Sequence, residues 1–385
     1  PIEPVAPYGT KAIGGYLFII KYGITKWYRL FNPRQLLVLV RLVKLIREVG
    51  KVIMEEKIKE GWSEKNAIRY AEAITAYLAI ALIRYADYNC LSTVWNYGGQ
   101  LPAQVAHALS MRGLAMMWNW GDVSPFAKMS GTGTWYMNLR KLVKVLSYLI
   151  TMFHEYSASL FGDETINTLE ARALIDDATV LSKLGSNEKF DLIVTDPPYY
   201  DDVPYSELSD FYYVWLKRAL SDVKDGGLVP KFLPEAFFKK VGDKWVEVRT
   251  QWEEYAKREV GLNPPRLGPN ATMEDGLKHF QNLLNLSFIV MSSRLKDDGL
   301  LVTYYAHTDP NAWKALLKAG WEAAGLRITN AFPIATESAQ RIIARGKLAL
   351  DTSIIAIWRK GIKGLISVSK LYSLMVEETS ARATE

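Results

Sequence analysis

The sequence has very little of the chemistry that sulfur and imidazole provide. Its 385 residues include one cysteine, Cys90, so an internal disulfide framework is excluded and a cysteine-rich zinc site is not expected. The few histidines are scattered along the chain, and we predict no metal site from them: His107, His154, His279 and His307. Such sparse cysteine usage is typical of a reducing, cytoplasmic setting.

Long hydrophobic runs are also missing. No stretch approaches the roughly 18 consecutive apolar residues that a membrane-spanning helix needs, and no cleavable signal opens the chain. We therefore expect no membrane partner. With 49% apolar and 23% charged residues, the composition indicates a soluble globular protein, long enough for one large domain or two ordinary ones.

Neither sign of charge dominates strongly. The chain has 47 basic and 41 acidic residues, so its net charge is 47 − 41 = +6, and its isoelectric point is near 9.0. This balance permits a polyanionic partner such as nucleic acid without requiring one. The 12 tryptophans and 21 tyrosines suit packing and base stacking equally well.

The first part of the chain is irregular and then helical. Residues 1–32 are rich in glycine, proline and aromatic residues, whereas residues 33–165 have the spacing of long amphipathic helices. We predict a helix from Pro33 with Asn32 as its N-cap, a second helix capped by Ser63, and a third over about 138–160.

Residues 166–365 alternate between strands and helices, which predicts an α/β domain with a mostly parallel sheet. The expected strands cover 173–175, 190–195, a stretch after a turn at 297–299, 326–335 and 351–360. The expected helices cover 206–220, with Ser206 as N-cap and Ser209 or Asp210 as a second possible start, 274–295 and 309–325. No long helix separates the last two strands, which allows an antiparallel edge pair. We interpret 221–272 as an insertion with loop chemistry and 366–385 as a C-terminal tail.

The stretch "FDLIVTDPPYYDDVPY", residues 190–205, joins a short apolar strand to a rigid turn. Pro197 and Pro198 have no N–H to donate, so the strand must end at about Asp196. Ligands bind at this carboxyl end of strands in open α/β sheets. The Asp196 carboxylate and Pro197 carbonyl can accept both protons of an exocyclic amine, while Tyr199 stacks on the base. Two such acceptors help the nitrogen lone pair attack a methyl group, and the prolines fix the geometry beforehand.

Asp196-Pro197-Pro198-Tyr199 after an apolar strand resembles the catalytic motif of amino-group nucleic-acid methyltransferases. The likeness extends to the prokaryotic adenine-specific methylases with a DUF1156 region through "YGITKWYRLFNPRQLL" (22–37), "DDATVL" (176–181), "DPPYYDDVPYSELSDFYYVWLKR" (196–218) and "LKDDGLLVTYY" (295–305). The resemblance implies S-adenosylmethionine as the methyl donor, DNA as the partner, and a Rossmann-like sheet whose last strand is antiparallel. It also implies that Asp177, with Ala178 beside it, lies next to the adenine amine of the donor.

The sequence departs from this family in one important respect. The glycine-rich turn of the form Asp-Pro-Phe-x-Gly-x-Gly, which cradles the methionine part of the donor, is missing; "AIGGYLF" (12–18) and "SGTGTW" (130–135) do not follow a convincing strand. The chain therefore resembles the C-terminal portion of such a methylase, with an incomplete sheet. Either the donor pocket is incomplete, or a second polypeptide completes it, or the helical region replaces it.

Three functions remain open at this point. The first is methyl transfer to adenine N6 in DNA, with the base flipped out of the duplex because its amine is otherwise paired. The second is methyl transfer to a base amine in RNA, because those enzymes share the turn. The third is a catalytically silent, partner-dependent half of a split methyltransferase that binds nucleic acid.

Several other residues are weaker candidates. Arg34 and Gln35 can reach a phosphate or the donor, and Asp122 lies in "WNWGDVSPF", where packing by Trp118 and Trp120 is the competing interpretation. His307 follows a strand end but is better explained as structural. Four acids near the turn are typical of solvated loops and helix caps: Asp201, Asp202, Glu207 and Asp210. Five cations suit contacts with phosphate or with solvent: Lys239, Lys240, Lys257, Arg258 and Arg266. Three loop residues have no assigned role: Thr336, Glu337 and Arg341.

Overall fold

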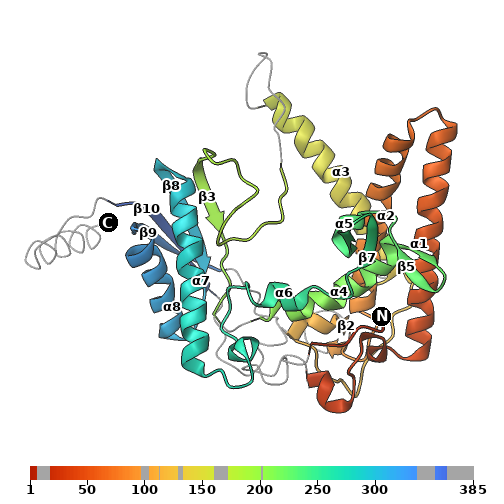
Figure 1. Ribbon diagram of the computed structural model, residues 1–385, viewed down its shortest axis with the longest axis horizontal. Coiled ribbons are helices and arrows are strands. Elements are labelled where there is room, and N and C mark those ends of the chain that lie inside the picture. The colour runs from red at the N-terminus through yellow and green to blue at the C-terminus, as the bar shows by residue number, and fades with distance from the viewer. Residues whose placement is uncertain are drawn as a thin grey trace, which may run out of the picture. The chain divides into compact units, whose positions relative to one another are not determined.

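The computed structural model describes residues 1–6, 18–96, 104–111, 113–128, 133–159, 172–200, 203–335 and 352–361. Within these residues the protein is a mixed α/β structure with eight α-helices and one mixed sheet of four strands, which confirms the α/β class (Figure 1). Contacts divide the chain into two compact units. Unit 1 comprises Pro1–Ile175, Pro198–Phe280 and Glu337–Asp351, and unit 2 comprises Asp176–Pro197, Gln281–Thr336 and Thr352–Glu385.

Unit 1 is built around long helices whose starts were readable in the sequence. Helix α1 (Pro33–Lys59) begins with a full capping box, in which Asn32 accepts from the Gln35 N–H and Gln35 accepts from the Asn32 N–H. Helix α2 (Glu64–Asp87) begins behind Ser63, whose hydroxyl accepts from the Asn66 N–H. Helix α3 spans Trp135–Ser159 and α4 spans Tyr205–Leu220.

Helix α2 is long and apolar enough to cross a membrane by length and composition alone. Its apolar side packs against α1, α3 and α4, where Ala67, Ala71 and Leu82 are buried. Of the most apolar 18 residues of α2, 33% are buried, so packing within unit 1 accounts for part of its apolar composition.

Short elements complete unit 1, and several lie in the stretch that the sequence analysis treated as loop. The strands form hairpins: β1 (Val94–Asn96) with β2 (Gln104–Ala106), β4 (Asp222–Lys224) with β5 (Gly227–Val229), and β6 (Phe238–Val241) with β7 (Lys244–Glu247). The short helices are α5 (Pro234–Phe237), α6 (Trp252–Ala256) and the 3₁₀ turns Phe18–Tyr22, Trp27–Leu30, Ala108–Met111 and Pro264–Leu267.

Helix α4 and residues 221–272 belong to unit 1, although we expected them within the 166–365 domain. Aromatic packing explains the difference. Phe211 of α4 contacts the Trp27 and Phe31 rings at centroid distances of 5.7 and 6.1 Å, and Trp215 contacts Phe31 at 5.3 Å. These rings bury α4 in the helical core, a long-range pairing that local sequence patterns do not reveal.

Unit 2 contains the four-stranded sheet in the order β3-β8-β10-β9. Strand β3 (Phe190–Thr195) is parallel to β8 (Leu295–Tyr305), whereas β10 (Thr352–Lys360) is antiparallel to both β8 and β9 (Leu326–Ala335). One face is covered by α7 (Met273–Arg294) and α8 (Pro310–Leu317), the latter continuing as a π-helical turn over Lys318–Ala323 (Figure 1). Phe288 of α7 packs on the Trp358 ring, and the Tyr305 hydroxyl donates to the Ala312 carbonyl.

Two predicted features of the strands are wrong, one at the end of the first segment of unit 1 and one in unit 2. Residues 173–175 form no strand, because no neighbouring strand pairs with them among the described residues, and Leu174 and Ile175 are exposed. The turn expected at 297–299 is instead an irregularity within β8, where the pairing shifts from Phe190–Leu295 to Leu192–Leu300. Residues 173–175 are not a strand because they have no partner strand in the described part of the chain, and residues 297–299 belong to a strand because β8 pairs with β3.

Candidate functional site

The Asp196 turn begins where β3 ends. Thr195 is the last strand residue and lies opposite Thr303 in the parallel ladder, so Asp196 follows at the carboxyl end of a parallel strand pair. The prediction that the strand stops before Asp196 is confirmed. Asp196 is exposed and Pro197 is buried, and both belong to unit 2. An exposed carboxylate at this edge stands where open α/β sheets bind their ligands.

The backbone after Pro197 is held by local and distant hydrogen bonds within unit 1. The Tyr200 N–H donates to the Pro198 carbonyl at 3.0 Å, and the Tyr200 carbonyl accepts from the Leu262 N–H at 2.9 Å. Tyr200 has a positive φ of 60°, which is strained for a bulky side chain, and its ring packs edge-on against Phe280 at 5.2 Å. Tyr199 is half-buried. No donor among the described residues bonds to the Pro197 carbonyl.

Asp177 and Ala178, the candidate donor-binding residues, lie in a turn that is stabilised by its own side chains. Asp177 Oδ1 accepts from the Thr179 N–H at 2.9 Å and from the Thr179 hydroxyl at 2.6 Å. Asp176 accepts from the Lys183 N–H, which lowers the pKa of its carboxyl group. Ala178 is exposed. The Asp177 carboxylate thus caps its own turn. An amine of the methyl donor would have to bind the same carboxylate alongside Thr179.

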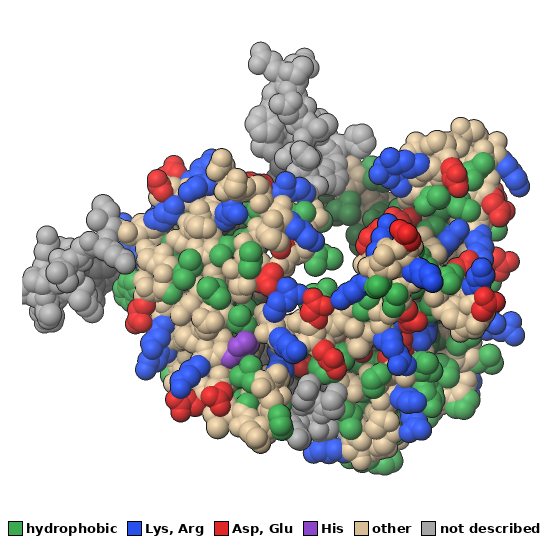
Figure 2. Space-filling model, in the orientation of Figure 1, with side chains coloured by type: hydrophobic (Ala, Val, Ile, Leu, Met, Phe, Trp, Pro, Cys, Tyr) green, Lys and Arg blue, Asp and Glu red, His purple; other side chains and the backbone are tan. Residues whose placement is uncertain are grey.

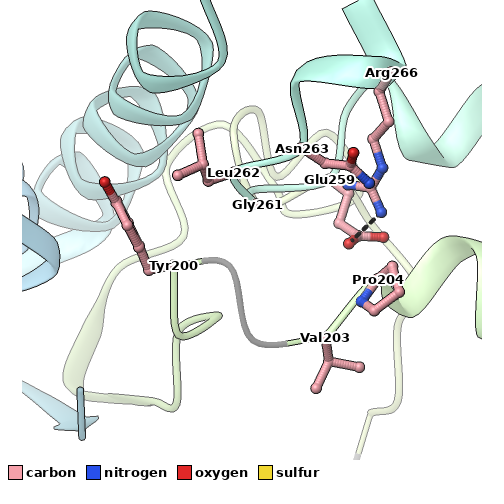
Figure 3. A pocket seen from close by; sticks show the side chains of 8 residues that line it. All are labelled: Tyr200, Val203, Pro204, Glu259, Gly261, Leu262, Asn263 and Arg266. Carbon is pink, nitrogen blue, oxygen red and sulfur yellow. Dashed lines mark hydrogen bonds and ion pairs between the residues drawn. The ribbon is translucent and has the colours of Figure 1, made fainter. Parts of the chain in front are cut away.

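A cluster of buried charges adjoins Tyr200 in unit 1 (Figure 3). Arg266, whose side chain is 4% exposed, donates to Glu207 at 2.8 and 2.5 Å and to Glu259 at 2.8 Å. Burial disfavours the guanidinium, but the two carboxylates outweigh this cost and raise the pKa of Arg266. Glu259 also accepts from the N–H groups of Tyr205 and Ser206 at the start of α4.

This arrangement corrects the predicted cap of α4. The helix begins at Tyr205 with Pro204 at the N-cap position, and Ser206 does not cap it but donates its hydroxyl to Glu259. The cap is therefore a carboxylate from 53 residues further along the chain. Beside it, Asn263 Oδ1 and Arg266 Nη1 are buried without a partner among the described residues. These atoms line a small cavity together with Tyr200 and Val203.

Two segments that the sequence analysis selected separately meet in the structure. Arg34 and Gln35, at the start of α1, both donate to Asp122, Gln35 at 2.5 Å and Arg34 through Nε at 2.9 Å. Arg34 is therefore already paired with an acid. Trp118 is 78% exposed, and its ring contacts the Tyr22 ring. Gly133 lies so close to Tyr88 that a side chain there would clash. Close packing against Tyr88 therefore requires glycine at position 133.

Other candidates have structural roles or lie outside the described residues. His307 Nδ1 accepts from the Asp309 N–H at the start of α8, which fits its structural interpretation. Asp210 is buried and accepts from the Trp27 indole and the Thr250 hydroxyl. Sequence reasoning missed Glu259 as a helix cap and Arg266 as a buried cation, since nothing local marks them. The candidates outside the described ranges are Asp201, Asp202, Thr336, Glu337, Arg341, the glycines of 12–18 and residues 130–132 of "SGTGTW".

The visible surface carries both signs of charge. Lys and Arg side chains alternate with Asp and Glu over the face drawn in Figure 2, so no single-sign field covers that face. Among the described residues, no three His, Cys, Asp or Glu side chains are grouped so that they could hold a metal ion. No protein-family model matches the chain significantly, and no curated protein or solved structure does so either.

Proposed function

We propose that this protein takes part in methyl transfer to the exocyclic amine of a flipped nucleobase, with adenine N6 in DNA as its target. One observation carries the proposal. Asp196 and Pro197 stand at the carboxyl end of parallel strand β3, where the carboxylate is exposed and no described donor occupies the Pro197 carbonyl. The last strand, β10, is antiparallel to both neighbours, which supports the methyltransferase-type sheet that the resemblance implies.

The chemistry assigned to the turn needs only hydrogen-bond acceptors and a ring. Asp196 accepts one proton of the amine and the Pro197 carbonyl accepts the other, so the nitrogen lone pair turns out of the base plane toward the methyl group. Tyr199 stacks on the base, worth about 1–3 kcal/mol. As the N–C bond forms, the S–C bond of the sulfonium donor would break to leave S-adenosylhomocysteine, and the extra amine proton would pass to the Asp196 carboxylate and then to water. Because the prolines restrain the backbone, the acceptors are in place before the base arrives.

S-adenosylmethionine would supply the methyl group, but the described residues build only part of a site for it. Asp177 is held by Thr179, no strand precedes β3 in the described sheet, and Gly133 is used for packing against Tyr88. Asp196, Pro197 and Tyr199 suit the binding of a base amine. The described residues of this chain do not form a complete pocket for the methyl donor.

A transfer assay tests the reaction. The purified chain is incubated with methyl-labelled S-adenosylmethionine and either DNA or RNA, and the nucleic acid is digested to nucleosides. The proposal expects label in N6-methyl-2′-deoxyadenosine from DNA. Label that appears only in RNA nucleosides would move the activity to the RNA alternative, and label in neither, with or without added partner proteins, would contradict methyl transfer.

A second candidate, a partner-dependent half of a split methyltransferase, is favoured by the open side of the sheet. Strand β3 is an edge strand of the sheet formed by the described residues, and its Leu192 and Val194 side chains are 55% and 57% exposed. The pairing register puts them on the face opposite Leu301 and Trp358, the residues that α7 and α8 cover. Phe332 and Ile334 of β9 are also exposed. Parallel sheets normally have both faces covered, so this apolar face is unusual.

Chain topology indicates what would cover that face. Strand–helix–strand connections are right-handed, and the connections that run from β3 toward β9 carry α7 and α8 on one face. Strands added beyond β3 in the other direction would, with the same handedness, carry their helices on the opposite face. A polypeptide with the missing glycine-rich strand–turn–helix would therefore extend the sheet and cover Leu192 and Val194.

Titration calorimetry separates this candidate from the first. We expect no measurable binding of S-adenosylmethionine to the chain alone, and binding after a polypeptide with the Asp-Pro-Phe-x-Gly-x-Gly turn is co-purified with it. Tight binding by the chain alone would reject the split arrangement and leave a self-sufficient enzyme.

A further inference from the structure

A basic stretch without acids accounts for the positive balance of the chain. Residues 18–47 contain seven cations and no aspartate or glutamate, compared with a net charge of +6 for the whole chain. The cations are Lys21, Lys26, Arg29, Arg34, Arg41, Lys44 and Arg47. Such a concentration of positive charge is the usual electrostatic feature of a surface that contacts phosphates.

Two exposed aromatic rings lie at the beginning of this stretch. Tyr22 is 56% exposed and Trp118 is 78% exposed, and their ring centroids are 5.7 Å apart with the planes at 87°. Tryptophan is usually largely buried, so a tryptophan this exposed is informative. In an edge-to-face pair, the edge of one ring covers at most one face of the other, and the remaining faces are available for a planar ligand.

The backbone holds both rings in place. Tyr22 ends the 3₁₀ turn Phe18–Tyr22, and Gly23 follows with φ of 79°, a conformation that glycine adopts without strain. The Ile19 N–H donates to the Leu114 carbonyl at 3.4 Å, and the Met117 N–H donates to the Leu91 carbonyl at 3.0 Å. The segments that carry Tyr22 and Trp118 are thus tied to each other and to the helical core of unit 1.

Cations accompany the ring pair. Arg29 donates to the Gly23 carbonyl at 3.2 Å, which brings its guanidinium next to the residue after Tyr22. Lys21 precedes Tyr22 and is exposed. Arg34 is also exposed, but its charge is offset by Asp122. Arg29 is therefore held beside the ring pair by a direct contact, and Lys21 adjoins Tyr22 in the chain.

We propose that Tyr22 and Trp118, together with Lys21 and Arg29, bind single-stranded nucleic acid. Bases stack on the two rings while the cations face the phosphates, the combination that sequence-tolerant single-strand binders use. Both the stacking and the charge are required, because rings alone would fit an apolar partner and cations alone would fit duplex. The proposal shares with the proposed function only its nucleic-acid partner.

Fluorescence anisotropy with a labelled 20-nucleotide oligo-dT, and with a duplex of the same length, tests this surface. Stacking on Trp118 predicts that Trp118→Ala weakens oligo-dT binding about 5- to 150-fold and leaves duplex binding unchanged. The matched control is Trp321→Ala, because Trp321 is 62% exposed and belongs to unit 2. A Lys21→Gln, Arg29→Gln variant should reduce the salt dependence of log Kd by about 1.4, since each phosphate contact on a single strand contributes about 0.7.

The outcomes are distinct from those of the methyl-transfer assay, because binding is read without the donor. Asp191→Asn, which changes an exposed acid outside both proposed sites, should bind oligo-dT as the wild type does. Trp118→Ala binding within twofold of the Trp321→Ala control would overturn the proposal, and so would a wild-type protein that does not bind oligo-dT at low salt. Both aromatic variants change exposed side chains, and unchanged thermal unfolding would verify that they fold.

Discussion

At the scale of single residues, Asp210 shows how far a buried site can change an ordinary carboxyl group. Burial raises its pKa from 3.8 to about 6, although hydrogen bonds from Thr250 and Trp27 oppose the change. The Trp27 indole donates to Asp210 Oδ2 at 2.7 Å. Because Asp210 lies in the aromatic core of unit 1, its protonation state affects folding stability.

The raised pKa predicts a pH-dependent stability. Below pH 3.8 the group is protonated in both the folded and the unfolded chain, and its contribution to the free energy of unfolding is complete. As the pH rises through about 6 this contribution is lost, and the free energy of unfolding falls by about 3 kcal/mol in total. Asp210→Asn cannot ionise, so its stability relative to the wild type should rise by a similar amount between pH 4 and pH 7. Urea unfolding at four pH values measures this, and a difference independent of pH would contradict it.

At the scale of elements, helix α4 shows how a distant residue can set a helix start. The sequence places Ser206 where a cap is expected, yet Glu259 accepts from the Tyr205 and Ser206 N–H groups and also pairs with Arg266. Helix N-termini favour a carboxylate because their N–H groups lack partners and carry partial positive charge.

Substitutions distinguish the two caps. Glu259→Ala removes the partner of two N–H groups and of a buried guanidinium, and we expect it to lower the free energy of unfolding by about 3 kcal/mol. Ser206→Ala removes one hydroxyl and should cost about 1 kcal/mol. Glu254→Ala is the control, since Glu254 is an exposed acid in surface ion pairs worth less than about 1 kcal/mol. A larger loss for Ser206→Ala than for Glu259→Ala, by urea unfolding, would show that the serine is the cap after all.

At the scale of the whole molecule, local signals predicted the elements better than their partners. The starts of α1 and α2, and the bounds of β3, were readable because caps, prolines and β-branched runs act within a few residues. The sequence has no long helix between the last two strands, which allowed an antiparallel pair. The antiparallel pairing of β10 with β9 agrees with this prediction.

What the sequence could not predict depends on distant contacts. Residues 173–175 look like a strand but have no strand beside them, and α4 joins unit 1 through rings of Trp27 and Phe31 that lie far away in the chain. At the candidate site, the position of Asp196 at the end of β3 followed from two prolines, whereas the Arg266 cluster behind Tyr200 did not follow from any local pattern. Fold predictions were thus reliable where a single segment decides and unreliable where two segments must meet.

The most direct measurement is labelled methyl transfer by two acid variants of the same strand region. Asp196→Ala should abolish transfer to adenine in DNA, because one of the two acceptors for the amine is lost, while its unfolding free energy stays close to that of the wild type. Asp191→Asn, which alters an exposed acid of β3 that pairs with Lys296, should keep near wild-type transfer. Equal labelling by Asp196→Ala and the wild type would contradict the role of this carboxylate.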